Sequence, residues 1–460
     1  MRKAVTLLLA AGILLGAAAG NAGAVELRTS GTYEFGWSWS DTALERDDPT
    51  DTFRAVQRIR PQFDFVVSDN LSGTFGLEIG DGDWGSGAWG MGGDATNALK
   101  VRYAYMDWTV PGIDVSLRMG LHEAETPSYT FFTVFAETAA GISFSRDIND
   151  NVGIAGGWFR PYNTINKTHD SVDVFMLSLP VKGDGFEVNP WGMLALAGSA
   201  ALGDALTAPP NNGSELDGLW SLVPVDATAA QLAAISKTRP TGWWLGIGGE
   251  LSVFDPFTLA MDFVYGSFDA GDVAGYDIKR AGWMIAAQAN YKLDMMTPGI
   301  IMWYASGDDS NPTNGSERLP AIFGDSWATN FGGDGGWYDA ASLTTDLSGS
   351  WGVGLRLDDI SFVENLSHNL RLTYYQGTNN KAMAAVAGAP AGTGYGNFYL
   401  TTKDRAWEAN FETTWQIYKN LSASFELGYI KLDLDEDIWG SRSDFDDKMY
   451  KAGIYMTYKF

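Results

Sequence analysis

Strict alternation of apolar and polar side chains is the feature that most restricts how this chain can fold. In the final segment, 450–460, Tyr, Ala, Ile, Met, Tyr and Phe occupy the even positions, and the odd positions are mostly polar or small. Successive side chains of a β-strand point to opposite faces, so such a strand has one apolar and one polar face. Segments 25–39, 257–266 and 421–429 repeat the pattern. These segments are 9 to 15 residues long, which is enough for a tilted strand to cross a bilayer.

The chain begins with a segment typical of exported proteins. Arg2 and Lys3 precede an apolar run rich in Ala and Gly, and Ala22-Gly23-Ala24 has the form that a signal peptidase cleaves. A transmembrane helix is the alternative, but the run is short and a cleavage site follows it at once. We therefore expect 1–24 to be a signal peptide and 25–460 to form a single domain.

The composition favours a closed sheet with a wet interior over a soluble domain. The chain contains 55 glycines and 13% aromatic residues, and it has no cysteine. A barrel with a polar lumen needs only alternate residues to be apolar, so its mean hydropathy stays near neutral, as it is here. A formal net charge of -25 argues against a nucleic-acid partner, because phosphates would be repelled. The composition therefore indicates an all-β, antiparallel transmembrane β-barrel.

Short turns alternate with long connections, as in a barrel with tight periplasmic turns and free extracellular loops. Eight turns and nine loops predict eighteen strands, and merging a doubtful hairpin near 358–371 would give sixteen. The predicted turns lie near 68–70, 110–112, 147–151, 183–185, 254–256, 296–298, 358–367 and 418–420. The predicted long connections are 41–52, 81–97, 121–137, 160–170, 199–240, 268–279, 306–345, 377–402 and 433–446. Within one of them, 226–237 resembles a short capped helix.

The parity of each strand predicts which charges face the lumen. Where alternate apolar residues meet lipid, the residues between them face water. In segment 99–105 this places Leu99, Val101, Tyr103 and Tyr105 toward lipid and the intervening cations toward the lumen. The cations assigned in this way to one basic wall are Arg28, Arg54, Arg58, Arg60, Lys100, Arg102 and Arg118.

Acidic residues are expected to oppose this basic wall. The connection after the wall brings Glu123 and Glu125, and farther round the barrel three more acids point inward: Glu408, Glu412 and Glu426. Opposed charges across a narrow lumen create a transverse field that orients dipolar solutes and disfavours apolar ones. The alternative is that the arginines pair with acids of neighbouring strands, which makes a buried charge tolerable. The acids considered for this pairing are Asp64, Glu78 and Asp114.

Other motifs do not indicate catalysis or a firm metal site. Gly80-x-Gly82-x-x-Gly85 does not open a helix, so it lacks the helix N-terminus that a dinucleotide site needs. His122, His169 and His368 lack ligand spacing for zinc, and no nucleophile lies beside a base, so no enzyme activity is expected. One acidic loop is a weak candidate for calcium, although Ile438 stands where a helical-hand loop needs glycine. Its acids are Asp433, Asp435, Glu436, Asp437, Asp444, Asp446 and Asp447.

The alternating strands, the short turns opposite long loops and the secretory signal together resemble the trimeric porins of Gram-negative outer membranes. The most similar group is the homotrimeric porin family of sulfate-reducing Desulfovibrio-type bacteria, and the resemblance covers the whole mature chain. It implies a general diffusion pore of three barrels, with the third outer loop, here 122–136, folded into the lumen. The Pro-Glu-Phe-Gly-Gly motif of enteric porins is absent, so details of their constriction are not carried over.

The C-terminus also resembles a known signal. Phe460, with Tyr458 and Met456 on the same face, resembles the C-terminal segment by which the outer-membrane assembly machinery recognises barrels. The expected partners are therefore this machinery, outer-membrane lipid and lipopolysaccharide, further copies of the chain, and small polar solutes. A non-specific diffusion porin is the first hypothesis, a solute-selective channel the second, and a structural or adhesive surface barrel the third.

Overall fold

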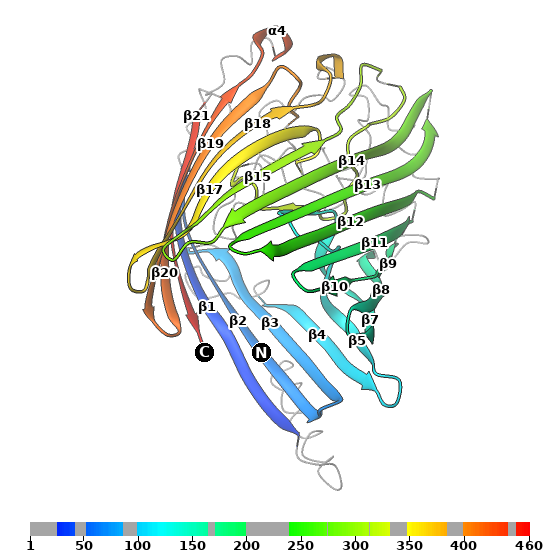
Figure 1. Ribbon diagram of the computed structural model, residues 1–460, viewed down its shortest axis with the longest axis vertical. Helices are drawn as coiled ribbons and strands as arrows, with labels where there is room; N and C mark the ends of the chain where they lie inside the picture. The colour runs from blue at the N-terminus through cyan, green and yellow to red at the C-terminus, as the bar shows by residue number, and fades with distance from the viewer. Residues whose placement is uncertain are drawn as a thin grey trace.

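The chain folds into a sheet that closes on itself. The computed structural model describes residues 25–41, 52–85, 99–163, 171–198, 239–273, 275–311, 313–331, 347–383, 399–439 and 448–460. In these residues every ladder between wall strands is antiparallel, and the first strand pairs with the last, which closes the barrel. Figure 1 shows the strands inclined around the barrel. The predicted signal peptide, 1–24, and the predicted helix, 226–237, lie outside the described residues.

Eighteen of the 21 described strands build the wall, because β6 and β16 pair only with each other and β10 continues β9 beyond Pro180. The strands are β1 (Glu26–Asp41), β2 (Thr52–Ser68), β3 (Leu71–Asp83), β4 (Leu99–Val110), β5 (Val115–Glu125), β6 (Phe132–Thr133), β7 (Ala136–Asn149), β8 (Val152–Asn163), β9 (Ser171–Ser178), β10 (Val181–Gly183), β11 (Phe186–Ala197), β12 (Thr241–Phe254), β13 (Phe257–Val273), β14 (Tyr276–Tyr291), β15 (Thr297–Ala305), β16 (Asp325–Ser326), β17 (Ser350–Val363), β18 (Leu366–Gly377), β19 (Arg405–Tyr418), β20 (Leu421–Asp433) and β21 (Lys448–Lys459). Two short helical turns, η3 (Lys381–Met383) and α4 (Glu436–Trp439), lie between strands.

The alternation in the sequence separates an outer from an inner face. On β13, Leu259 and Met261 are exposed on the outside, whereas Ala260 and Asp262 between them are buried on the inside. Closure gives every wall strand two neighbours, so backbone groups in the hydrocarbon layer are hydrogen-bonded without water. The predicted transmembrane β-barrel of eighteen strands is thereby confirmed. No helix in the described part of the chain is both long enough and apolar enough to cross a membrane.

Two predicted connections differ from the structure. The doubtful hairpin is real, because β17 runs to Val363 and β18 begins at Leu366, so the alternative of sixteen strands is wrong. The predicted long connection at 268–279 is also wrong, because β13 and β14 remain paired through Asp272 and Asp277. The Asp- and Gly-rich composition there is that of a loop, but a strand that projects beyond the bilayer tolerates polar residues on both faces.

The C-terminal residue completes the closure. The Phe460 backbone N–H donates to the Gly31 carbonyl at 3.0 Å, and the Gly31 N–H donates to the Phe460 carbonyl at 3.1 Å. Gly31 has no room for a side chain, since a Cβ atom would lie 2.7 Å from the Phe460 ring. The Phe460 and Tyr33 ring centroids are 5.6 Å apart, and Tyr458 is the next ring on the same outward face. The terminal aromatic therefore seals the seam between β1 and β21.

Candidate pore constriction

A loop between β5 and β7 crosses the interior and is anchored on the far wall. We call residues 126–135 the constriction loop. The carboxylate of Asp262 on β13 accepts hydrogen bonds from the backbone N–H groups of Tyr129 (2.9 Å) and Thr130 (2.7 Å). It also accepts bonds from the hydroxyls of Thr130 (2.6 Å) and Ser128 (3.2 Å). Four donors on one buried carboxylate hold the loop tip against β13.

The tip of the constriction loop also contacts β11 and β14, the strands on either side of the pair β12 and β13. The Tyr129 hydroxyl donates to Glu187 on β11 at 2.8 Å, and the Gln288 amide on β14 donates to the Tyr129 carbonyl at 3.1 Å. The loop is shorter than the predicted connection 121–137, because β5 continues to Glu125 and β7 begins at Ala136. Glu123 and Glu125 therefore lie at the end of a wall strand, at the base of the loop.

A second segment also lies inside the barrel. We call residues 313–331 the second inward segment. Its strand β16 pairs with β6 of the constriction loop, with Asp325 opposite Thr133 and Ser326 opposite Phe132. The Trp244 indole on β12 donates to the Pro320 carbonyl at 2.7 Å, which fixes the segment to the inner wall.

The sequence predicted an outer loop here, at 306–345, and missed the inward course. The available signal was the apolar run Leu319-Pro320-Ala321-Ile322-Phe323 within an otherwise polar connection. Leu319, Ala321 and Ile322 of this run are buried. An apolar run of this kind in a long loop of a barrel has no lipid to contact, so it packs inside.

Asn330, at the end of the second inward segment, binds strands β18, β19 and β21. Its backbone N–H donates to Glu408 on β19, and its carbonyl accepts a 2.8 Å bond from the Lys451 ammonium on β21. Arg371 on β18 donates to the Asn330 side-chain oxygen and to the Trp327 carbonyl. Three strands thus hold one residue of the segment.

The seven cations of the predicted basic wall are ion-paired. Arg28 pairs with Glu26 near the rim of the barrel, where 62% of its side chain is exposed. Of the acids considered in the sequence, only Glu78 takes part. The partners on neighbouring strands were missed because they depend on register, whereas Glu26 is on the same strand as Arg28. The remaining pairs are Arg54–Asp83 (3.0 Å), Arg58–Glu34 (2.5 Å), Arg60–Glu78 (2.7 Å), Lys100–Glu78 (3.3 Å), Arg102–Glu123 (3.5 Å) and Arg118–Asp107 (2.7 Å).

A bulge in β4 corrects the predicted orientation of two tyrosines. Gly76 pairs with Tyr103 while Leu77 pairs with Val101, so Arg102 is the extra residue and the parity reverses after it. Tyr103 and Tyr105 consequently face the lumen, where the Tyr103 hydroxyl donates to Glu123. The Arg118 guanidinium lies 4.2 Å from the centre of the Tyr105 ring. The prediction that both tyrosines face lipid is wrong, because it continued the odd-numbered alternation of Leu99 and Val101 past the bulge. The outward apolar residues after the bulge, Met106 and Trp108, are at even positions.

Three carboxylates gather at the base of the constriction loop. Glu123 and Glu125 end β5, and Asp325 of the second inward segment acts electrostatically on Glu125 together with Glu123. We call these three residues the constriction acids. Glu123 is 66% exposed at its side chain and reaches Arg102 of the basic wall. The sequence predicted the first two, but Asp325 becomes part of the group only through the pairing of β16 with β6.

The three acids predicted on the opposite wall lie among cations. Glu408 is 3% exposed and accepts a 2.7 Å bond from Asn410 in addition to the bond from Asn330. Glu412 accepts a 3.0 Å bond from the Tyr455 hydroxyl. Glu412 and Glu426 line a cavity of about 300 Å³ together with Arg356 and Arg371. This part of the wall therefore carries charges of both signs.

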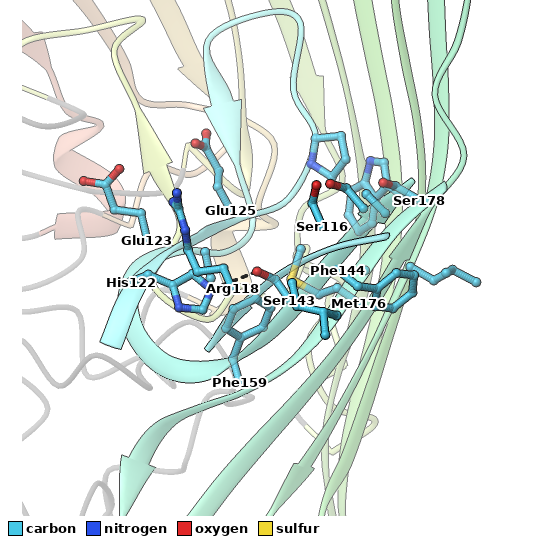
Figure 2. Close-up of a pocket in the computed structure, with 18 of the residues that line it drawn as sticks. Ser116, Arg118, His122, Glu123, Glu125, Ser143, Phe144, Phe159, Met176 and Ser178 are labelled. Carbon is cyan, nitrogen blue, oxygen red and sulfur yellow. Dashed lines mark hydrogen bonds between the residues drawn. The ribbon is translucent and has the colours of Figure 1, made fainter. Parts of the chain in front are cut away.

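A cavity of about 540 Å³ lies beside Arg118 and the first two constriction acids. Figure 2 shows these side chains with His122 and Ser143. The two nitrogens of His122 contact the Gly120 carbonyl and the Ser143 hydroxyl, both at 3.0 Å, and its ring lies 5.4 Å from that of Phe159. These contacts give the buried histidine a structural role in the wall.

The remaining histidines and the acidic loop considered for calcium lie in different parts of the chain. His368 contacts the Thr413 hydroxyl at 2.8 Å, and His169 lies outside the described residues. In the acidic loop, Asp433 pairs with Arg405, and α4 holds Glu436 and Asp437. Asp444, Asp446 and Asp447 lie outside the described residues. Among the residues that are described, no three His, Asp or Glu side chains converge on a common metal position.

Comparison with known proteins gives a structural match only. No sequence-family profile and no curated protein sequence matches the chain. Among solved structures it is similar to OccK11 (OpdR) of Pseudomonas aeruginosa, with a TM-score of 0.52, 12% identity and coverage of 94% of this chain and 96% of that chain. The outer membrane protein OprD of Pseudomonas aeruginosa gives a TM-score of 0.51, 12% identity and coverage of 94% and 93%. The fold is therefore similar to that of the outer membrane protein OprD.

A third solved structure gives a match of the same quality. OccK3 (OpdO) of Pseudomonas aeruginosa also matches with a TM-score of 0.52 and 12% identity, over 95% of this chain and 96% of that chain. Each of these alignments spans nearly the whole barrel of both proteins. The predicted resemblance to Gram-negative porins is confirmed at the level of the fold.

Proposed function

We propose that this chain is a porin of a Gram-negative outer membrane that passes small hydrophilic solutes and ions by passive diffusion. The observation that carries the proposal is a closed wall, apolar outside and charged inside, whose interior is narrowed by two inward segments. Such an interior gives a hydrated solute a polar path through the apolar layer. The short turns would face the periplasm and the long connections the exterior.

The charges at the constriction would select solutes by an electric field. The exposed cations of the basic wall, chiefly Lys100 and Arg118, stand on the same side of the barrel as the acid Glu123. Their partners on adjacent strands neutralise part of each charge, so the remaining field is local to this side of the passage. A dipolar solute aligns with this field, whereas an apolar solute gains nothing for the ordered water it displaces.

Conductance of the purified protein in planar bilayers tests the proposal. We expect discrete steps with a linear current–voltage relation and no saturation as the concentration of small sugars or salts increases. A protein that inserts into bilayers as a folded barrel without conducting would contradict the proposal. So would a mature chain that dissolves without detergent as a compact monomer.

A solute-selective channel is the second candidate, favoured by the pairing of β6 with β16. Two segments that are hydrogen-bonded inside the barrel leave less open lumen than one loop does, and a narrow passage brings a solute into contact with its walls. This function predicts that one solute class blocks the ionic current with a finite affinity. Linear, unblocked currents with all tested sugars, amino acids and carboxylates would exclude it.

We further propose that the protein assembles as a homotrimer, as the resemblance to Desulfovibrio-type porins implies. The alternating C-terminal segment that ends at Phe460 supports recognition by the barrel assembly machinery, and the small residues Ala22-Gly23-Ala24 support removal of 1–24 on export. Unheated gel electrophoresis and mass measurement in detergent would show a threefold mass. A monomer under both conditions would contradict the trimer without affecting the proposed channel.

A further inference from the structure

A row of outward-facing side chains crosses four adjacent strands near the long-connection rim of the barrel. Strand register places Tyr374 of β18 beside Trp407 of β19, Trp407 beside Lys431 of β20, and Lys431 beside Lys448 of β21. Both lysines are exposed, whereas their chain neighbours Leu432 and Met449 are buried on the inner face. The register between these strands is regular here, so the row faces outward throughout.

Aromatic residues mark the height of this row relative to the bilayer. The rings of Tyr374 and Trp407 are 4.6 Å apart, and Trp407 is 58% exposed. Two residues farther from the rim, Tyr429 and Tyr450 face each other on the same outer surface, 43% and 48% exposed. Exposed Tyr and Trp of barrels lie where hydrocarbon meets lipid headgroups. The two lysines are therefore at headgroup level.

Three cations gather at this position. Lys431 and Lys448 are directly opposite each other, an arrangement in which like charges repel. Arg405 lies two residues nearer the rim than Trp407 on β19. It pairs with Asp433 at 2.6 Å, with about half of each side chain exposed. We call Arg405, Lys431 and Lys448 the outer basic cluster. Arg405 of this cluster has Asp433 as an ion-pair partner, and Lys431 and Lys448 add two further cations to the outer face.

We propose that the outer basic cluster binds a phosphorylated headgroup of the outer leaflet, namely a lipid A phosphate of lipopolysaccharide. A phosphate between Lys431 and Lys448 would offset their mutual repulsion and accept a charge-assisted hydrogen bond from each ammonium. The acyl chains below it would lie against Tyr429 and Tyr450. The acids of α4, Glu436 and Asp437, would contribute to the same phosphate only through a divalent cation, because they repel it directly. The inference rests on the proposed outer-membrane location.

Native mass spectrometry of the full mature protein in detergent with EDTA tests the site. The probes are bisphosphorylated lipid A, lipid A without phosphates, and inorganic phosphate as a competitor. The variant is Lys431→Gln with Lys448→Gln. The matched control is Lys182→Gln with Lys419→Gln, which removes two exposed lysines at the short-turn rim. Lys431→Arg with Lys448→Arg keeps both charges. Bilayer conductance of each variant is recorded in parallel.

We expect the Gln variant to bind bisphosphorylated lipid A roughly 10- to 30-fold more weakly than the control, with the Arg variant near wild type. Lipid A without phosphates should bind all variants equally weakly. Equal binding of bisphosphorylated lipid A to the Gln variant and the control would overturn the proposal. Full competition by millimolar inorganic phosphate would also overturn it, because the site would then recognise a free anion. Unchanged bilayer conductance in the Gln variant shows that the channel still works. A negative binding result then counts against the lipid A site and not against the proposed channel.

Discussion

The basic wall, β1 to β5, and the arc from β13 to β21 use charged residues in different ways. On the basic wall, each cation pairs with a carboxylate of the same or an adjacent strand, as in Arg60–Glu78. On the opposite arc, side-chain pairs such as Arg405–Asp433 also occur, but other charges bind the backbone of the inward segments, as Asp262 binds Tyr129 and Lys451 binds Asn330. We call this arc the anchoring arc.

Charged residues of the basic wall can therefore act on permeating ions, whereas charged residues of the anchoring arc hold the inward segments in place. A pair on the basic wall such as Arg118–Asp107 leaves part of both charges exposed to water, so it can act on a passing ion. A bond from a buried charge to a backbone group holds a segment in place, and its loss changes the shape of the passage. Substitutions in the two regions should therefore have different consequences.

Loss of the Asp262 carboxylate should have the largest effect, because it removes the acceptor that holds the constriction loop on the anchoring arc. In Asp262→Ala, four donors of the constriction loop lose their acceptor, and we expect a loss of about 3 kcal/mol of loop anchoring. Single-channel conductance and the size limit for polyethylene glycols should both rise. Asp269→Ala is the control, because this exposed residue of β13 faces outward. Equal conductance of the two variants would show that the loop is held by other contacts.

Charge reversal on the basic wall should alter ion preference with little change in shape. For Lys100→Glu with Arg102→Glu, we expect the ratio of cation to anion permeability to rise roughly tenfold, because both positions face the lumen. The reversal potential under a salt gradient measures the change. Arg28→Glu at the exposed rim should have a much smaller effect, since mobile ions screen it. An unchanged reversal potential in the double variant would count against the basic wall.

Two matched lysine substitutions compare the regions directly. Lys451→Met removes a charge-assisted bond to the Asn330 carbonyl, and we expect it to lower unfolding stability by about 1 to 2 kcal/mol. Lys100→Met should leave stability unchanged, because Glu78 keeps its bond to Arg60. Urea unfolding in detergent and the reversal potential are measured on both. The comparison fails if Lys451→Met shifts ion preference more than Lys100→Met does.

The smallest expected effect concerns Glu317 in the second inward segment. Burial and the carboxylates of Asp309 and Asp308 raise the pKa of Glu317 above its ordinary value. The folded state then binds the proton more tightly, so this contribution to stability is full below the unfolded pKa and is lost as the pH rises through the folded pKa.

Replacement by a neutral side chain should remove this pH dependence. Glu317→Gln should leave the Tm unchanged near about pH 4 and raise it by about 1 °C near about pH 7. The backbone N–H of Asp309 keeps an acceptor, because glutamine retains a side-chain oxygen. Thermal unfolding at both pH values provides the measurement. An equal change at both would mean that the ionisation of Glu317 does not affect the fold.

Much of the barrel could be predicted from the sequence because its strands obey a local rule. Lipid contacts every second residue, so the hydropathy pattern reveals the outer face of segments such as 257–266 and 421–429. Turn residues then separate the strands, and the count of eighteen follows. The extension of β13 and β14 into the predicted connection 268–279 was missed because it projects beyond the bilayer, where hydropathy no longer distinguishes strand from loop.

The sequence by itself determined that this chain has alternating faces and a basic group of residues on consecutive strands. Only the tertiary structure decided which acid meets each cation, because ion pairs such as Arg58–Glu34 depend on register. It also decided the reversal of parity at Arg102 and the inward course that brings Asp325 to the constriction. Alternation is a property of neighbours along the chain, whereas register, bulges and loop anchors depend on contacts between residues far apart in it.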